Sequence, residues 1–304
     1  MAIDEKILER VLRKKEELNN CRPFNKAALH KLQETFRVDL TYNSNAIEGN
    51  SLSLSETKLV LEEGITIGGK SLKEHLEVTN HSKAIDIVES LVNRPKIGEM
   101  DVLNLHAIIL DRIDPENAGF YRRAGVRISG TAYSPPNAAK VPGLMQEVYR
   151  LLNTRGGEPI GTAAEVHRMF VDIHPFIDGN GRTARLLLNL YLMRNGYPPV
   201  ILLKVERKKY IGTIEITRKG GDITPFANFV ARAVDRSLSI YLDSLGREQI
   251  DYLSLAEAAN LSKNGYSQEY LSLLARTGKI GAVKFGRDWK ITREALEEYE
   301  RENG

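Results

Sequence analysis

The chain has 304 residues, more than one typical domain, so we expect two or three compact units. Its 43 lysines and arginines and 40 aspartates and glutamates leave a net charge of +3, which is too small to indicate a nucleic-acid-binding protein by itself. Cys21 is the only cysteine, which excludes an internal disulfide and any zinc or redox site built from several thiols.

The N-terminal residues are densely charged and lack the apolar core of a signal peptide. No apolar run in the chain approaches the roughly 18 residues needed to cross a membrane. We therefore expect a soluble, cytoplasmic protein without a membrane partner. Apolar residues recur at helical spacing over 3–18 and again over 25–40, and Pro23 separates these two predicted helices.

The second helix is predicted to end in the stretch Ser44-Asn45-Ala46-Ile47-Glu48-Gly49-Asn50. Gly49 can take the left-handed conformation that often stops a helix. Glu48 is out of place there, because a carboxylate in the last turn faces the negative end of the helix macrodipole. Either this carboxylate is solvated or it has a cationic partner elsewhere in the fold.

Three further helices are predicted before residue 111. Ser53 and Glu56 form a capping-box pattern that opens the first of them, and the other two run over 71–92 and 100–110. His75 and His81 lie in the helix at 71–92, six residues apart, which is not a metal-binding spacing on one helix face. We interpret both histidines as structural residues.

The pattern changes after residue 118. Val126-Arg127-Ile128 alternates apolar and polar side chains and ends at Gly130. A second extended stretch, 132–134, precedes two prolines. These features predict a β-hairpin in an otherwise helical protein.

Two helices are predicted over 141–152 and 163–173. They lead to the stretch with the highest concentration of candidate catalytic and binding residues, His174-Pro175-Phe176-Ile177-Asp178-Gly179-Asn180-Gly181-Arg182-Thr183-Ala184-Arg185. His167 lies two helical turns before His174, but no third metal ligand is evident, so we interpret His167 as structural. The next helix, 186–193, is apolar almost all round and is expected to be deeply buried.

The glycines and arginines of this stretch indicate a polyphosphate ligand. Gly179 and Gly181 let the backbone turn tightly and approach a ligand, and the helix that starts there has unpaired first amides. Arg182 and Arg185 are three residues apart, so they lie on one face of the helix near its positive end.

The remaining polar residues suit transfer of a phosphate group. Asp178 could hold Mg²⁺ against phosphate oxygens, because this ion prefers one or two carboxylates and takes substrate oxygens and water as its other ligands. His174 then remains as the general base. Each of these residues alone has an ordinary structural explanation, but an ordinary turn has no reason to concentrate them.

The C-terminal residues predict a small separate domain. Helices over 205–216 and 226–242 come first, and 245–247 is a plausible linker. The elements that follow resemble a winged helix-turn-helix of the excisionase type, in the order helix 253–259, helix 267–277, hairpin 283–291 and helix 293–301. Between Arg276 and Arg293 there are six Lys or Arg and one Asp, so this domain could contact DNA. A protein-docking module with solvated lysines is the alternative.

The stretch from His174 to Arg185 matches the signature His-x-Phe-x-Asp/Glu-Gly-Asn-Gly-Arg-x-x-Arg without a mismatch. The chain therefore resembles the Fic family of protein adenylyltransferases. The resemblance implies that His174 deprotonates a target hydroxyl and that Asp178 carries Mg²⁺. It also implies that the phosphates of ATP are bound by Gly179, Asn180, Gly181, Arg182 and Arg185.

Two stretches before the signature extend the resemblance. Ser44-x-x-x-Glu48-Gly49-Asn50 is similar to the family's inhibitory motif, in which Glu48 would pair with Arg185 and occupy the space of the γ-phosphate. The predicted hairpin resembles the family's flap, where Val126, Arg127 and Ile128 would bind a target segment by main-chain pairing.

Two residues after the signature concern the nucleotide. By resemblance, Tyr210 would help to bound the nucleotide site. Arg218 stands where relatives commonly have an asparagine that contacts the base. This departure leaves other transferred groups, such as UMP, open.

We thus expect a mainly α-helical protein with an inhibitory helical region over 1–95, a Fic-type core with a flap over 96–244 and a winged helix over 250–304. Its expected activity is transfer of AMP from ATP to a Ser, Thr or Tyr hydroxyl of a target protein, restrained by Glu48. One alternative is removal of AMP at the same site. Another is a DNA-binding regulator whose Fic core senses a nucleotide. A homo-oligomer is also open.

Overall fold

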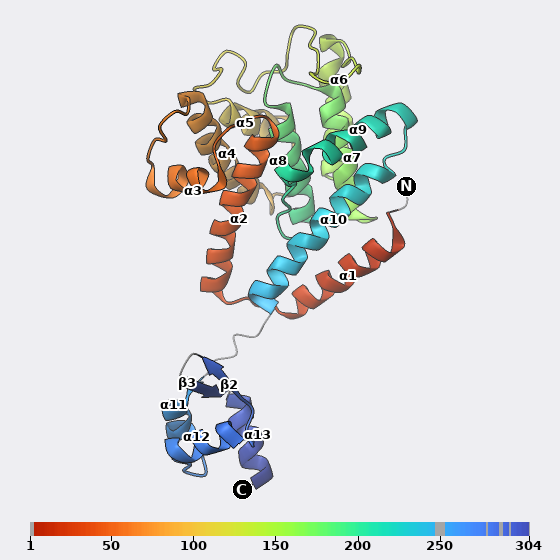
Figure 1. The fold of residues 1–304 in the computed structure, drawn as a ribbon. Helices are drawn as coiled ribbons and strands as arrows, with labels where there is room; N and C mark the ends of the chain where they lie inside the picture. The colour runs from red at the N-terminus through yellow and green to blue at the C-terminus, as the bar shows by residue number, and fades with distance from the viewer. Residues whose placement is uncertain (1–2, 247–252, 278, 286–287, 292, 304) are drawn as a thin grey trace. The chain divides into compact units, whose positions relative to one another are not determined.

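A computed structural model describes residues 3–246, 253–277, 279–285, 288–291 and 293–303 (Figure 1). The chain divides into two compact units, Met1–Gly246 and Arg247–Gly304. Each unit has a hydrophobic core of its own. Within the described residues, no helix has an apolar stretch long enough to cross a membrane.

The first unit is helical, which confirms the fold class predicted from the sequence. Its helices are α1 (Glu5–Asn20), α2 (Lys26–Ile47), α3 (Leu54–Glu63), α4 (Leu72–Leu91), α5 (Glu99–Ile109), α6 (Val141–Leu152), α7 (Pro159–Ile173), α8 (Asn180–Arg194), α9 (Arg207–Gly220) and α10 (Thr224–Tyr241). Short 3₁₀ turns, Ala138–Lys140 and Lys204–Glu206, precede α6 and α9, and a π-helical turn, Leu242–Gly246, follows α10. The capping box predicted at Ser53 and Glu56 is formed.

Helix α8 lies at the centre of the unit. Almost all of its residues are buried, and over 186–193 its sequence is apolar almost all round. Helix α7 packs along α8, and α4 and α5 also contact it. The core therefore surrounds the helix whose first two turns carry the arginines of the signature.

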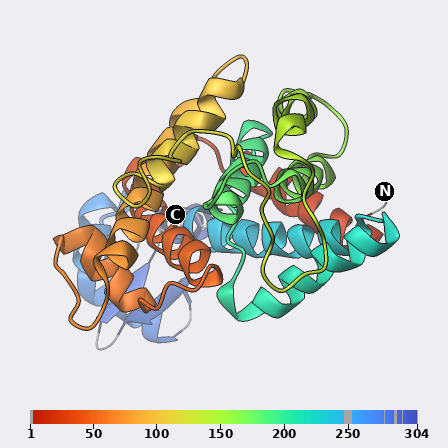
Figure 2. The ribbon, with the colours of Figure 1, turned by 90° about the horizontal axis from the view of Figure 1, so that it is seen from above.

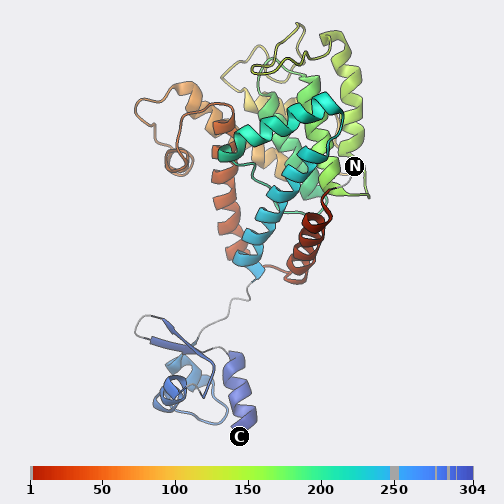
Figure 3. The same cartoon turned by 45° about the vertical axis from the view of Figure 1, so that its right-hand side comes forward.

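The N-terminal helices are tied to this core at several points. Helix α1 lies along α10 (Figure 3), where Asp235 accepts from Arg10 at 2.7 Å and from Lys14 at 2.6 Å. Helix α2 packs against α4, and Arg37 of α2 pairs with Asp86 of α4 at 2.5 Å. Helix α2 is thereby held with its C-terminal end beside α8.

The prediction of a β-hairpin between residues 119 and 136 is wrong. No strand is present there, and the segment runs as an extended loop toward α9 (Figure 2). The alternation is real, since Val126 and Ile128 are half-buried and Arg127 is exposed. The returning stretch forms no ladder with it, and the Thr131 hydroxyl donates to Glu215 of α9 at 2.9 Å. We keep the name flap for residues 124–136.

The second unit contains a three-stranded antiparallel sheet and three helices. In chain order they are β1 (Leu253–Ser254), α11 (Leu255–Leu261), α12 (Gln268–Thr277), β2 (Ala282–Phe285), β3 (Asp288–Ile291) and α13 (Arg293–Asn303). Strand β3 is central, and Ile291 lies opposite both Leu253 and Ala282. The order of elements is the predicted one, and the interpretation as a winged helix-turn-helix stays a prediction.

Candidate active site

His174 is the residue directly after α7. It adopts the left-handed conformation (φ 50°, ψ 60°), which is uncommon for residues other than glycine. Its Nδ1 lies 3.2 Å from the carbonyl oxygen of Val171. Because a carbonyl can only accept, Nδ1 carries the proton of the neutral ring and Nε2 keeps its lone pair. Burial lowers the pKa of His174, which favours this neutral form.

The loop between α7 and α8 is closed by the side chain of Asn180. Its Oδ1 accepts from the N–H of Phe176 at 3.0 Å, and its Nδ2 donates to the carbonyl of the same residue at 2.9 Å. Asn180 is buried, and both ends of its amide group are used within the loop. Any contact of Asn180 with a phosphate is therefore left to its backbone N–H.

His106 of α5 supports the same loop, and nothing in the sequence had singled it out. Its ring stacks on Phe176 with the ring centroids 3.5 Å apart. The N–H of Gly119 donates to Nδ1 at 3.0 Å, so Nε2 carries the proton and donates to the carbonyl of Asp178 at 3.0 Å. Burial lowers the pKa of His106 to about 4, and the ring is neutral near pH 7. His106 thus fixes the peptide that precedes Gly179.

The first turn of α8 combines free amides with a buried arginine. No side chain caps the start of the helix at Gly179, which has φ 75°. Arg182 is 2 % exposed and lies 3.3 Å from Glu77 of α4 and 3.5 Å from Asp178. Its Nε has no hydrogen-bond partner among the described residues. The carboxylate of Glu77 therefore balances the charge of Arg182, a pairing that the sequence did not reveal.

Arg185 is held by the C-terminal end of α2. Its Nε donates to Ser44 Oγ at 3.0 Å and its Nη2 to the carbonyl of Ser44 at 2.8 Å. Its Nη1 lies 2.8 Å from Glu48 Oε1. The carboxylate of Glu48 sits so close to Gly181 that a Cβ at position 181 would collide with it. Helix α2 ends as predicted, with Gly49 at φ 106°.

Helix α9 and the turn before it anchor the end of α2 that bears Glu48. The backbone N–H of Lys204 donates to Asn43 Oδ1 at 2.9 Å. Arg207 Nε donates to the carbonyl of Ile47 at 2.7 Å. The end of α2 that bears Glu48 is thus bonded at two points, while the Glu48 side chain is 41 % exposed.

A cleft of about 170 Å³ lies beside His174, Gly181 and Glu48. Of the residues predicted for the site, the cleft is lined by Glu48, Ile128, His174, Gly181 and Tyr210. Its other walls come from the flap, from the end of α2 and from α9. The other predicted site residues do not line it: Val126, Arg127, Asp178, Gly179, Asn180, Arg182 and Arg185. The Tyr210 hydroxyl is bonded to His167 Nε2 at 2.9 Å, which agrees with the interpretation of His167 as a structural residue.

The end of the cleft near α9 is crossed by a polar network. Arg218 Nε donates to Asp172 at 2.7 Å, and its Nη1 donates to Glu215 at 2.6 Å. The guanidinium carbon of Arg218 lies 4.5 Å from the ring centroid of Tyr133 in the flap. Arg218 is thereby held in place by two carboxylates and an aromatic face.

Known proteins with similar sequences and folds decide the family. The profile described as "Fic/DOC family" matches residues 96–192. The solved structure titled Fic-1 (aa134–508) from C. elegans is 35 % identical, with a TM-score of 0.71, over 78 % of this chain and 71 % of that chain. The chain belongs to the Fic/DOC family.

Two further relatives agree with membership of the Fic/DOC family. A Fic domain containing signaling protein from Bacteroides thetaiotaomicron is 27 % identical, with a TM-score of 0.72, over 77 % of this chain and 96 % of that chain. The protein adenylyltransferase Fic of Drosophila ananassae is 38 % identical over 245 residues, which are 79 % of this chain and 48 % of that protein. The chain therefore spans about half the length of the curated relatives that it matches.

A magnesium ion, which the Fic/DOC resemblance implies, fits the donor set at Asp178. Its side chain is 51 % exposed, and Oδ1 accepts from the N–H of Gly179 at 2.6 Å. The described residues contain no cluster of three or more His, Cys, Asp or Glu that could hold a metal by itself. One exposed carboxylate beside the uncapped start of α8 suits Mg²⁺, which prefers one or two carboxylates and takes its other ligands from substrate oxygens and water.

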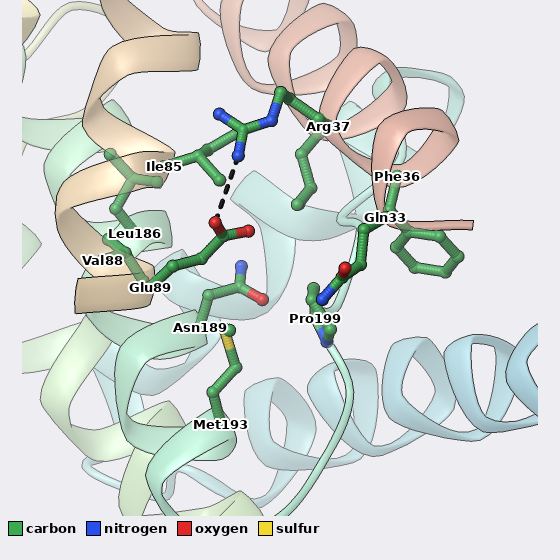
Figure 4. A pocket seen from close by; sticks show the side chains of 11 residues that line it. Gln33, Phe36, Arg37, Ile85, Val88, Glu89, Leu186, Asn189, Met193 and Pro199 are labelled. Carbon is green, nitrogen blue, oxygen red and sulfur yellow. Dashed lines mark hydrogen bonds and ion pairs between the residues drawn. The ribbon is translucent and has the colours of Figure 1, made fainter. Parts of the chain in front are cut away.

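A second cavity lies on another side of α8, between α2 and α4 (Figure 4). Its volume is about 60 Å³, and its walls are mainly apolar. Its two charged residues pair with each other, since Arg37 donates to Glu89 at 3.1 Å. Asn189 on its floor is bonded to backbone groups of Arg185 and Val200. We interpret this cavity as a packing gap in the core.

Proposed function

We propose that this Fic/DOC protein transfers AMP from ATP to a hydroxyl group of a protein target. The observation that carries the proposal is that His174 and Gly181 line the same cleft, with the uncapped start of α8 beside the unprotonated Nε2 of His174. A base and an anion site thus face the same space. The names of the Drosophila relatives agree with this activity.

In the proposed reaction, the target's hydroxyl oxygen attacks the α-phosphorus of ATP in line with the departing pyrophosphate. His174 Nε2 takes the hydroxyl proton as the oxygen–phosphorus bond forms. The bond between the α-phosphorus and its bridging oxygen breaks, and pyrophosphate leaves. The amides at the start of α8 and the guanidinium of Arg185 bind phosphate oxygens. Mg²⁺ at Asp178 offsets their negative charge when it is bound.

Glu48 restrains this reaction in our proposal. The Arg185 guanidinium is the group that would bind the γ-phosphate, and its Nη1 already faces Glu48 at 2.8 Å. The carboxylate also lies over Gly181, where a phosphate would approach the backbone. ATP would then bind only in a pose that keeps its α-phosphorus out of line with the hydroxyl.

One experiment tests the nucleotide, the target and the restraint together. Wild-type and Glu48→Gly proteins are incubated with a cell lysate and with each α-labelled nucleotide in turn. We expect labelled proteins with ATP and more label with the Glu48→Gly variant. Labelling with UTP and with no other nucleotide would show that the transferred group is UMP and not AMP. Release of AMP from a pre-labelled target, without any labelling, would favour the AMP-removing alternative.

The pH dependence of transfer should report the environment of His174. Burial lowers its pKa below the ordinary value of about 6.5, and a general base works only when unprotonated. The acid limb of kcat/KM for ATP, which reports the ligand-free protein, should therefore lie below pH 6.5, so that transfer persists when the pH falls through that value. The profile is measured with the Glu48→Gly variant, and a limb above pH 6.5 would contradict a buried base.

The second unit should be dispensable for the chemistry. All residues of the signature, Glu48 and the flap belong to the first unit, which ends at Gly246. A chain that ends at Leu245 should keep self-labelling within about twofold of the full-length rate. Gel autoradiography with both chains checks this. A truncated chain that folds, by circular dichroism, yet does not label itself would refute the separation.

We propose DNA as a partner of the second unit. Gln268 and Arg276 of α12 are exposed, and Ser272 lies between them, so the three follow one face of the helix at a spacing of four. A groove beside this face is lined by Arg276 and by Trp289 of β3. A band-shift assay with genomic fragments tests the proposal, with Arg276→Ala as the variant. Equal binding of both proteins would count against this face.

A further inference from the structure

Arg122 is a buried arginine whose guanidinium is bonded to backbone carbonyls. It is 3 % exposed and lies two residues before the flap, whereas its neighbour Arg123 is exposed. Its Nε donates to the carbonyl of His174 at 2.7 Å, and Nη2 is 3.3 Å from that of Ile173. It also binds two carbonyls of the flap, at Ala124 and Pro136.

The first pair of carbonyls belongs to the C-terminal end of α7. The last carbonyls of a helix have no partner within it, and a cation there also meets the negative end of the helix macrodipole. Only a planar fork with five N–H donors can reach carbonyls in several directions at once. A lysine at position 122 would place three donors on one nitrogen and could not reproduce this pattern.

These bonds act on the residue that we propose as the base. His174 is in the left-handed conformation, which is unfavourable for a residue with a Cβ. Its carbonyl is fixed by Arg122 Nε, and the backbone N–H of Arg122 donates to the next carbonyl, that of Pro175, at 2.9 Å. Arg122 thus fixes the peptide groups on the C-terminal side of His174. The backbone at His174 in turn sets the direction of its imidazole.

The second pair of carbonyls lies at the two ends of the flap. Arg122 Nη1 donates to Ala124 at 2.9 Å and Nη2 to Pro136 at 2.5 Å. The residues between them include Ile128 and Thr131, which line the cleft. One guanidinium therefore holds both ends of the flap against the turn that carries His174.

We infer that Arg122 is a positioning residue that sets the flap and His174 in one fixed relation. The inference rests on the proposed function, in which His174 is the base and the flap receives the target. Because the target hydroxyl is placed by the flap and its proton is taken by His174, release of either would misalign the attack on phosphorus. Arg122 and the flap ends at Ala124 and Pro136 do not line the cleft in which we propose that ATP binds.

The test compares two buried arginines that both bind helix-end carbonyls. Arg194 is 8 % exposed and donates to the carbonyl of Leu91 at the end of α4, at 3.1 Å, and to that of Arg94 just beyond it, at 2.6 Å. Arg122→Lys and Arg194→Lys are made in the Glu48→Gly protein. We expect Arg122→Lys to lower kcat by about 10- to 100-fold, with KM for ATP within about twofold. Arg194→Lys should lower the melting temperature and leave kcat within about twofold.

A second readout needs no turnover. The flap offers trypsin one exposed site, Arg127, and release of its ends should speed cleavage there. Mass spectrometry follows the cleavage. We expect faster cleavage after Arg127 in Arg122→Lys and an unchanged rate in Arg194→Lys. Should Arg122→Lys fold poorly, Arg122→Gln replaces it in the same comparison.

Two outcomes would overturn the inference. The first is a kcat of Arg122→Lys no lower than that of Arg194→Lys, and the second is an equal rate of cleavage after Arg127 in both. If the Glu48→Gly parent itself transfers no nucleotide, the proposed function fails, and the cleavage rate alone then decides whether Arg122 holds the flap.

Discussion

His174→Ala should lower AMP transfer by at least about 100-fold and leave ATP affinity within about twofold of the parent value. The proposed base acts on the attacking hydroxyl, whereas the phosphates are bound by α8 amides and arginines. Among the described residues, the imidazole is bonded to none of those groups, and its Nδ1 faces the carbonyl of Val171. Transfer is measured in the Glu48→Gly background and ATP binding by calorimetry.

Two further variants make the His174 result specific. His174→Asn removes the base but retains a residue type that tolerates the left-handed conformation, so loss of activity there cannot be assigned to backbone strain. His30→Ala removes an exposed imidazole from α2, where the ring lies 3.5 Å from Glu34, and should change nothing. A loss of ATP affinity comparable to the loss of transfer would contradict the role of His174.

The elements that could be predicted from the sequence are those with local causes. Helix α6 was predicted over 141–152 and has these bounds, because its apolar residues recur at helical spacing and Pro142 sits in its first turn. The capping box at Ser53 is likewise a pattern within four residues. The signature from His174 to Arg185 is contiguous, so its chemistry could be read without knowledge of the fold.

The parts that could not be predicted depend on contacts between distant residues. His106 reaches the carbonyl of Asp178 across 72 positions, and Arg122 reaches His174 across 52. Nothing near either residue in the sequence marks these contacts. The flap shows the converse, since alternation of Val126 and Ile128 is a local pattern, but a hairpin needs a partner strand. No second strand forms beside this stretch, and the Thr131 hydroxyl of the returning chain is bonded to Glu215 of α9.

Glu48 could be predicted only as an anomaly with two explanations, a solvated carboxylate or one with a distant cation. The structure favours the second, because Glu48 Oε1 lies 2.8 Å from Arg185 Nη1 across 137 positions of the chain (185 − 48). The inhibitory role assigned to this pair remains a proposal, and the activity of Glu48 variants tests it.

Glu48→Gly should raise AMP transfer by at least about tenfold. A charge-assisted pair contributes roughly 1.5–3 kcal/mol, and the lower part of this range applies because the Glu48 side chain is 41 % exposed. About 1.4 kcal/mol corresponds to tenfold in rate or equilibrium. Initial rates of target labelling at saturating ATP measure the effect. Glu48→Gln is the matched variant, since it keeps the side chain over Gly181 without the charge and should release less inhibition than Glu48→Gly.

Arg185→Ala distinguishes a blocked site from a lost contact. This change also breaks the pair with Glu48, but it removes the guanidinium proposed to bind the γ-phosphate, so it should not activate the enzyme. The double variant Glu48→Gly, Arg185→Ala should be as inactive as Arg185→Ala alone, because relief of a block has no effect when the blocked group is absent. Unchanged labelling by Glu48→Gly would show that Glu48 does not restrain a competent site. Lower labelling, together with loss of AMP release from a pre-labelled target, would instead make Glu48 a catalytic group of the reverse reaction.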